Sequence, residues 1–297
     1  MQPRIAIVIA ADGDLETAKK ASTSAIVCSV LPHITKFDFD IVRGAGLPLD
    51  KYDLIHLVHP HVLHLKEIPV EAFAHLPPIT CNVWDPPFQE LPAVAIHLQT
   101  YFTASIVYHP MFVSLFGQLG VENVFYAPLS KDYSDLRALQ LPLPEVFTVG
   151  TMGTDNPIRR IHITEAAARL AGVQCHIITY SEHRTTFPLN PVEDFLSKIS
   201  LYIHCGFANI DSMNARDALC VGRPVVTTRV PGLGDLIEPG VNGMFYDGTP
   251  EGAAAAIGTC RPRLEDMSRN ARITSMVTPS EVASYYERCW SEVLEVV

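Results

Sequence analysis

A chain of 297 residues is longer than one hydrophobic core usually serves, so the sequence predicts two domains. The formal net charge of −10 argues against a nucleic acid or an anionic membrane surface as the main partner. No apolar run reaches the roughly 18–20 residues of a membrane span, so we expect no stable membrane insertion. The seven cysteines are spread without a Cys-x-x-Cys pair, which favours reduced thiols in a cytoplasmic protein.

Short apolar runs alternate with amphipathic segments along the first half of the chain. This alternation is typical of parallel strands joined by crossover helices. The predicted strands are Arg4–Ala10, Asp53–Val58, Ile79–Val83, Ser105–Tyr108 and Asn123–Ala127. The predicted helices are Leu15–Leu31 and Met111–Leu119, and Gly120 ends the second one.

The segment Leu139–Glu145 carries two prolines in unpatterned sequence, which predicts a linker between domains. The alternation restarts beyond it, with predicted strands at Val146–Thr151, Gln174–Thr179, Leu201–Cys205 and Pro224–Thr228. The predicted helices are Arg160–Ala171, Val192–Ile199, Met213–Val221 and Ser280–Val296. The sequence therefore predicts an α/β fold of two Rossmann-like domains, residues 1–140 and 141–279, facing a central cleft at the carboxyl ends of both sheets, with residues 280–297 as a final helix.

The most informative stretch is Ser200–Tyr246. A predicted strand there ends in the loop GFANIDS, and a helix follows from Met213 with Asp211 or Ser212 as its N-cap. The N–H groups and the dipole of such a helix end form an anion site. The alternative is an ordinary capped helix without a ligand.

This stretch resembles the signature of the retaining, GT-B-fold glycosyltransferases often called group 1. DALCVGRPVV (Asp217–Val226) matches a helix and strand of that family, and PGVNG (Pro239–Gly243) matches the turn that follows. YAPLSKDY (Tyr126–Tyr133) resembles the end of the family's N-terminal domain, and VGTMGTDNPIRR (Val149–Arg160) the start of its donor domain. The last helix resembles the one that crosses back onto the first domain.

The resemblance implies a reaction as well as a fold. A hexose-type sugar would move from a nucleotide-diphosphate sugar to an acceptor hydroxyl with retained anomeric configuration. The acceptor would be a glycan, a lipid-linked molecule or a small molecule. Such enzymes generally need no divalent metal, so we expect neither a metal nor a separate cofactor.

The resemblance also implies catalytic roles for four residues. Arg159 and Arg160 would contact the donor diphosphate and stabilise the charge of the leaving nucleotide. The family's two glutamates, separated by seven residues, map onto Asn209 and Asp217. Asn209 would face the transferred sugar, and nearby Asp211 would restore a carboxylate there.

Five further residues are candidates for donor binding. Gly13, after the first predicted strand, would let the backbone approach the donor. Ser212 and Met213 would contribute N–H donors to the phosphates, and Asp217 would accept hydrogen bonds from the ribose. Arg229 follows strand Pro224–Thr228. It would either contact the donor base or phosphate or be an ordinary surface residue.

Other interpretations stay open. A non-catalytic nucleotide-sugar-binding or scaffold protein on the same fold is one, and a nucleotide-sugar epimerase is another. His56, His59, His61 and His64 crowd the end of one predicted strand, but no cysteine or acidic residue is suitably spaced to complete a metal site. Trp84 is either a sugar-stacking platform or filler between domains.

Overall fold

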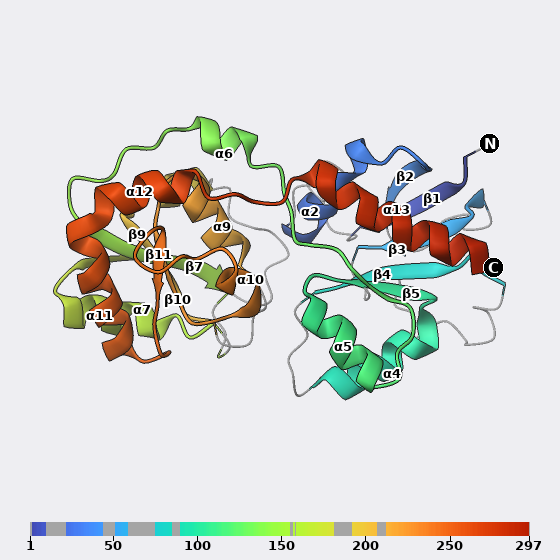
Figure 1. The fold of residues 1–297 in the computed structure, drawn as a ribbon, viewed down its shortest axis with the longest axis horizontal. Helices are drawn as coiled ribbons and strands as arrows, with labels where there is room; N and C mark the ends of the chain where they lie inside the picture. The colour runs from blue at the N-terminus through green and yellow to red at the C-terminus, as the bar shows by residue number, and fades with distance from the viewer. Residues whose placement is uncertain are drawn as a thin grey trace. The chain divides into compact units, whose positions relative to one another are not determined.

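The chain forms two compact units in a computed structural model that describes residues 2–9, 22–43, 51–58, 75–84, 90–154, 157, 159–180, 192–206 and 212–296. Unit 1 consists of Met1–Asp132 together with Val277–Val297, and unit 2 is Tyr133–Met276 (Figure 1). The sequence places the two boundaries at 140/141 and 279/280. Leu139–Glu145 lies in unit 2, where the guanidinium groups of Arg223 and Arg272 both donate to the Leu141 carbonyl.

Unit 1 is built on a parallel sheet of order β2-β1-β3-β4-β5-β6. Its strands are β1 (Arg4–Ile9), β2 (Asp38–Arg43), β3 (Leu54–Leu57), β4 (Ile79–Val83), β5 (Ala104–Val107) and β6 (Val124–Tyr126). Its helices are α2 (Ser22–Val30), η1 (Leu31–His33), α4 (Leu91–Tyr101), α5 (Pro110–Gln118) and α13 (Pro279–Val296). The strand order reverses between β1 and β3, which makes this pair the topological switch point.

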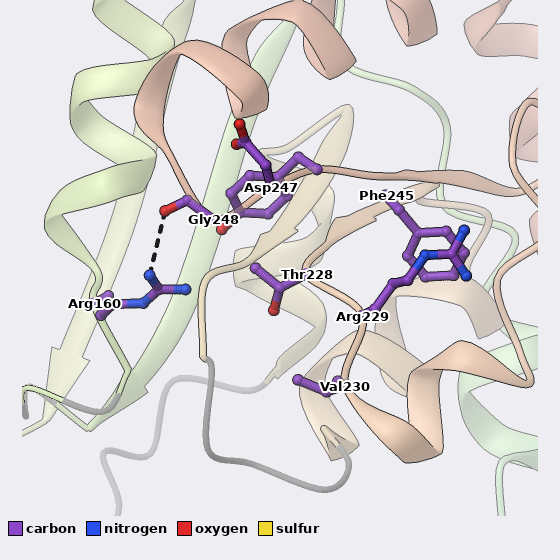
Figure 2. Close-up of a pocket in the computed structure, with 8 residues that line it drawn as sticks. Arg160, Thr228, Arg229, Val230, Phe245, Asp247 and Gly248 are labelled. Carbon is purple, nitrogen blue, oxygen red and sulfur yellow. Dashed lines mark hydrogen bonds between the residues drawn. The ribbon is translucent and has the colours of Figure 1, made fainter.

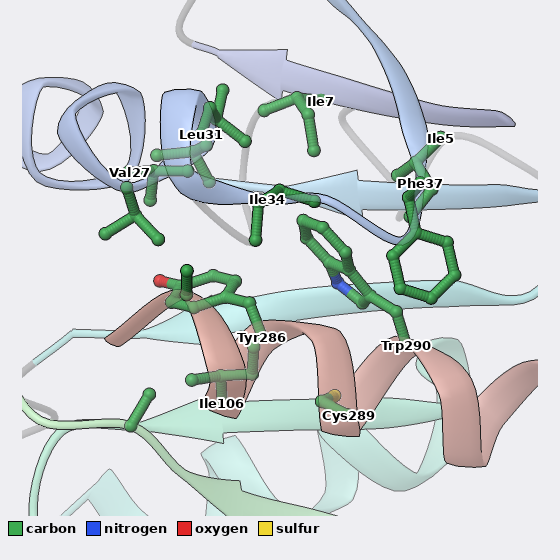
Figure 3. Packing of buried hydrophobic residues seen from close by; sticks show 14 of the residues in the cluster. Ile5, Ile7, Val27, Leu31, Ile34, Phe37, Ile106, Tyr286, Cys289 and Trp290 are labelled. Carbon is green, nitrogen blue, oxygen red and sulfur yellow. The ribbon is translucent and has the colours of Figure 1, made fainter. Parts of the chain in front are cut away.

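The C-terminal helix α13 packs onto the unit 1 sheet, as the resemblance implies. Tyr286 and Trp290 of α13 are buried in a cluster with α2, η1 and the strands (Figure 3). The Glu287 carboxylate accepts hydrogen bonds from the backbone N–H groups of Thr35 and Lys36, at 2.6 and 3.0 Å. Apolar packing and these polar contacts together fix α13 in unit 1.

Unit 2 is built on a second parallel sheet, of order β11-β10-β9-β7-β8. Its strands are β7 (Thr148–Thr154), β8 (Gln174–Tyr180), β9 (Leu201–His204), β10 (Val225–Thr227) and β11 (Gly243–Phe245). Its helices are α6 (Ser134–Ala138), α7 (His162–Ala171), α8 (Val192–Ser197), α9 (Met213–Cys220), α10 (Pro231–Gly234), α11 (Pro250–Cys260), η5 (Arg261–Arg263) and α12 (Leu264–Arg272). The order reverses between β7 and β9, so the switch point of this unit lies there.

Alternate residues along the unit 2 strands enter two different cores. Leu201 and Ile203 of β9 pack with α7 and α11, whereas Tyr202 packs with α8, α9 and α12. The sheet is thus covered on both faces at β9, which explains why all four residues of this strand are buried.

The predicted α/β class with two parallel-sheet units is confirmed, and several elements differ from expectation. Seven elements were not predicted from the sequence: β2, β11, α4, α6, α10, α11 and α12. The helix expected from Arg160 begins at His162, because Arg160 has φ +46° in the left-handed region and cannot continue a helix. Within the described ranges, no helix is long and apolar enough to cross a membrane.

Candidate functional site

A cavity of about 590 Å³ opens at the carboxyl edge of the unit 2 sheet. It is lined by Arg160, Thr228, Arg229, Val230, Phe245, Tyr246, Asp247 and Gly248 (Figure 2). The lining segments follow β7, β10 and β11, and these strands are parallel, so all three segments leave the same edge of the sheet. In open α/β sheets this edge is where ligands bind.

Arg160 is fixed at the switch point of the sheet. Its Nε donates to the carbonyl of Cys205, just after β9, at 3.0 Å, and its Nη1 donates to the carbonyl of Gly248 at 3.2 Å. A non-glycine residue with positive φ is uncommon, and such backbone geometry concentrates at functional sites. The two carbonyls hold the guanidinium in one orientation within the cavity lining.

Gly248 makes room for this arrangement. Its φ of +89° is strained for any residue with a side chain, and an added Cβ would lie 3.4 Å from both terminal nitrogens of Arg160. Glycine at this position therefore lets the backbone turn beneath the guanidinium.

Arg229 provides the second positive charge of the cavity. Its guanidinium carbon lies 4.3 Å from the ring centroid of Phe245, and the close-up view shows the two side chains overlying each other (Figure 2). The preceding residue is also anchored, because the Thr228 hydroxyl donates to the Gly206 carbonyl at 2.7 Å. Stacking on Phe245 pre-orients Arg229, which leaves less side-chain entropy to lose when an anion binds.

One carboxylate also lines the cavity. Asp247 Oδ1 accepts hydrogen bonds from the hydroxyl and the backbone N–H of Thr249, at 2.6 and 3.0 Å, and these bonds lower the pKa of Asp247. This carboxylate is therefore ionised and already engaged by Thr249. Two guanidinium groups against one engaged carboxylate make the cavity suited to a ligand with phosphate oxygens.

His204, the last residue of β9, is a buried and uncharged histidine at this edge. Its ring is buried, and its Nδ1 lies 3.2 Å from the Thr227 hydroxyl. Burial, and then the charges of Arg159 and Arg160, lower the pKa of His204 to about 3. At neutral pH the imidazole is therefore uncharged, and the positive charge of this edge comes from arginine.

Helix α9 begins near the same edge. The Ser212 hydroxyl accepts a hydrogen bond from the Ala215 N–H at 3.3 Å, so Ser212 is the N-cap, one of the two residues that the sequence offered for this position. The Asn214 amide donates to the Met152 carbonyl at 2.9 Å and ties the first turn of α9 to β7. Asp217 is 2% exposed in the second turn.

The structure brings together part of the predicted site. Arg160 and Arg229 share the cavity, whereas the other described candidates do not line it; these are Arg159, Ser212, Met213 and Asp217. Arg159 acts on the same edge through its charge, because it lowers the pKa of His204. Gly13, Asn209 and Asp211 lie outside the described residues, and all the assigned roles stay predictions.

The β11 side of the cavity, from Phe245 to Gly248, was not among the residues predicted from the sequence. The signal was present in GMFYDGTP: an apolar run, an Asp-Gly turn, and then Thr249 and Pro250 as the N-cap and first residue of α11. That pattern predicts a strand, a turn and a helix at this place.

The histidine cluster of the sequence has one described member. His56 is fully buried in β3 against the rings of Tyr286 and Trp290, so it belongs to the core of unit 1. His59, His61 and His64 lie outside the described residues. In the described part of the chain, no three His, Cys, Asp or Glu side chains gather as metal ligands would.

Comparison with known proteins identifies the fold. No protein-family model and no curated protein sequence matches the chain. Among solved structures, it is similar to HepE from Anabaena in complex with UDP and glucose, with 16% identity, a TM-score of 0.68 and full coverage of both chains. It is also similar to the catalytic domain of starch synthase IV from Arabidopsis thaliana bound to ADP and acarbose, with 10% identity, a TM-score of 0.70 and 99% of each chain covered.

A third similar structure is sucrose-phosphate synthase from Thermosynechococcus elongatus, with 12% identity, a TM-score of 0.65 and full coverage of both chains. At these identities the likeness concerns the fold. The two parallel-sheet α/β units of this chain have the GT-B fold of these glycosyltransferases.

Proposed function

We propose that this protein is a retaining glycosyltransferase that transfers a hexose-type sugar from a nucleotide-diphosphate sugar to an acceptor hydroxyl. The observation that carries the proposal is the cavity at the carboxyl edge of unit 2, which both Arg160 and Arg229 line. Two of the structures with the same fold are complexes, one with UDP and glucose and one with ADP and acarbose, which supports a nucleotide-sugar ligand.

The donor diphosphate would bind to the guanidinium groups of this edge. Arg160 is oriented by two carbonyls and Arg229 by the ring of Phe245, so both can meet phosphate oxygens with little reorganisation. Arg159 and the first turn of α9 would add charge and N–H donors on the α9 side. Asp217 would hold the ribose, and Asn209 and Asp211 would face the sugar.

The same groups support catalysis without a divalent metal, because guanidinium charge would balance the diphosphate. The chain contains two Asp-x-Asp spacings, at Asp12–Asp14 and Asp38–Asp40. The first lies outside the described residues. In the second, on β2 of unit 1, Asp40 pairs with Arg4 at 2.6 Å and accepts a hydrogen bond from the Tyr52 hydroxyl.

Calorimetric titration with UDP-, ADP- and GDP-glucose tests donor binding. Arg229→Ala should weaken binding of the preferred nucleotide sugar about 10- to 100-fold, the worth of one charge-assisted hydrogen bond. Arg269→Ala is the matched control: Arg269 is an exposed arginine of unit 2, paired with Asp266 and outside the cavity lining. Equal affinity of both variants for the nucleotide sugar would show that Arg229 does not bind the donor.

Donor turnover with and without acceptor then identifies the class of protein. A transferase turns over fastest with acceptor, an epimerase turns over without acceptor, and a binding protein shows neither activity. Anomeric configuration in the product, read by NMR, decides between retention and inversion.

A further inference from the structure

An aromatic pair stands at the carboxyl edge of the unit 1 sheet. Trp84 directly follows β4 and Tyr108 directly follows β5. Their rings are stacked, with centroids 4.4 Å apart and planes at 18°. Tyr108 is buried, whereas Trp84 is only half-buried.

Hydrogen bonds to the interior hold both rings. The Trp84 Nε1–H donates to the Val58 carbonyl, directly after β3, at 2.5 Å. The Tyr108 and Tyr286 hydroxyl oxygens lie 3.1 Å apart, and the Tyr286 hydroxyl donates to Asn82 Oδ1 at 3.2 Å. Trp84 is therefore fixed by packing and hydrogen bonds, as residues of pre-organised binding sites are.

Trp84 also lies at the place in the sheet where ligands bind in this type of fold. Because Trp84 bonds to the end of β3 and stacks on the residue after β5, its ring spans the ends of β3, β4 and β5. Strand β3 forms one side of the switch point of unit 1, and open α/β sheets bind their ligands beside such points.

The chemistry of the pair selects the kind of ligand. The polar end of the indole is occupied by the Val58 carbonyl and one face by Tyr108, so the part of the half-buried Trp84 ring that stays accessible is apolar. The groups that support this ring are neutral: Tyr108, Tyr286 and Asn82. A pyranose ring fits this surface, since one of its faces presents C–H groups while its hydroxyls stay in water.

We infer that Trp84 is the stacking platform for a pyranose ring of the acceptor, which makes the acceptor a saccharide. This inference rests on the proposed function and narrows its acceptor class. In this scheme the guanidinium groups of unit 2 bind the donor phosphates, and the aromatic ring of Trp84 in unit 1 binds the acceptor sugar.

The two tryptophans of the chain make the test direct. Trp290, on α13, is fully buried, whereas Trp84 is half-buried, so a contact between ligand and indole should change the emission of Trp84 alone. The intact protein is titrated with maltose, cellobiose and chitobiose. We expect a saturable emission change with at least one disaccharide in the wild type and no change in Trp84→Leu.

Kinetics then separate binding of the acceptor from binding of the donor. Trp84→Leu should raise the acceptor KM about 10-fold and leave the donor KM within about 2-fold. Tyr285→Leu is the matched control, because Tyr285 is an exposed aromatic residue of the same unit. Thermal unfolding of both variants excludes a loss of fold as the cause.

The outcomes distinguish failure of the platform from failure of the proposed function. Donor binding with no emission response to any saccharide overturns the platform and leaves the proposed function intact. An emission response to UDP alone also overturns it, because Trp84 would then stack on a nucleobase. A saccharide response that is lost in Trp84→Leu, without any nucleotide binding, would show that Trp84 binds a sugar but would overturn the proposed function, and with it the assignment of that sugar as an acceptor.

Discussion

Mild acid should destabilise unit 1 through a single buried histidine. His56 in β3 is 0% exposed, and its Nδ1 lies 2.9 Å from the Thr80 hydroxyl and 3.4 Å from the indole nitrogen of Trp290. Burial lowers the pKa of His56 from 6.5 to about 3. The folded protein therefore keeps this ring neutral at a pH at which the unfolded chain protonates it.

The sign and size of the effect follow from proton linkage. Between pH 6.5 and pH 3 the unfolded state binds a proton at His56 that the folded state does not, so stability is full above pH 6.5 and falls as the pH is lowered. Going from pH 7 to pH 5 should lower the free energy of unfolding by about 2 kcal/mol for this one group. Glu287 contributes to acid sensitivity only in a lower pH range. Burial opposes its charge, but hydrogen bonds from Thr35 and Lys36 outweigh burial and lower its pKa below 4.5.

Urea unfolding at pH 7 and pH 5 measures this difference. The emission of Trp290 reports on unit 1, and a Trp84→Phe background removes the second tryptophan. Adding His56→Gln to that background removes the titrating group, so the loss between pH 7 and pH 5 should shrink by about 2 kcal/mol. An equal loss in both proteins would refute the reasoning, since His56 would then have no part in the acid sensitivity.

Three further predictions concern unit 2. Arg223 is fully buried and donates to the carbonyls of Leu196, Leu141 and Pro142. Arg223→Met should therefore lower the free energy of unfolding, measured in urea, by about 3 kcal/mol. The control Arg169→Met, at an exposed arginine, should change it by less than about 0.5 kcal/mol. Gly248→Ala should displace Arg160 and weaken nucleotide-sugar binding in calorimetry, whereas Gly258→Ala in α11, where a Cβ meets nothing within 4 Å, should leave binding unchanged. Turnover should persist in EDTA, and a loss that Mn²⁺ or Mg²⁺ restores would contradict guanidinium neutralisation of the diphosphate.

The strands most readily predicted are those buried on both faces. Ile79–Val83 has the predicted bounds, and all five of its residues are buried, the polar Thr80 and Asn82 between the apolar Ile79, Cys81 and Val83 included. Strand β2 has the sequence DFDIVR and pairs only with β1 at the edge of the sheet. Its acidic residues break the apolar run, so the signal that identified the central strands was missing.

Helices α11 and α12 were missed for different reasons. The alanine-rich sequence of α11 has weak contrast between its faces, and its burial against α7 becomes visible only in the fold. In α12 a signal was present, because Met267 and Ala271 are spaced by one turn and both are buried among charged residues.

The candidate site was predictable in its residue types and not in its geometry. Arg160 and Arg229 follow predicted strands, so their presence at the carboxyl edge could be inferred from sequence. The guanidinium of Arg160 is oriented by carbonyls from Cys205 and Gly248, which belong to other segments of the chain. Local sequence patterns carry no information about such distant partners.

The departures from the family signature should affect transfer of the sugar more than binding of the nucleotide. The groups proposed to neutralise the diphosphate are Arg160 and Arg229, and their orientation depends on carbonyls, a glycine and Phe245. None of these is the position where Asn209 replaces a family glutamate. Nucleotide-sugar binding should therefore be retained even if asparagine at position 209 lowers turnover. Tight binding without turnover, followed by turnover in Asn209→Glu, would place the loss of chemistry at that one side chain.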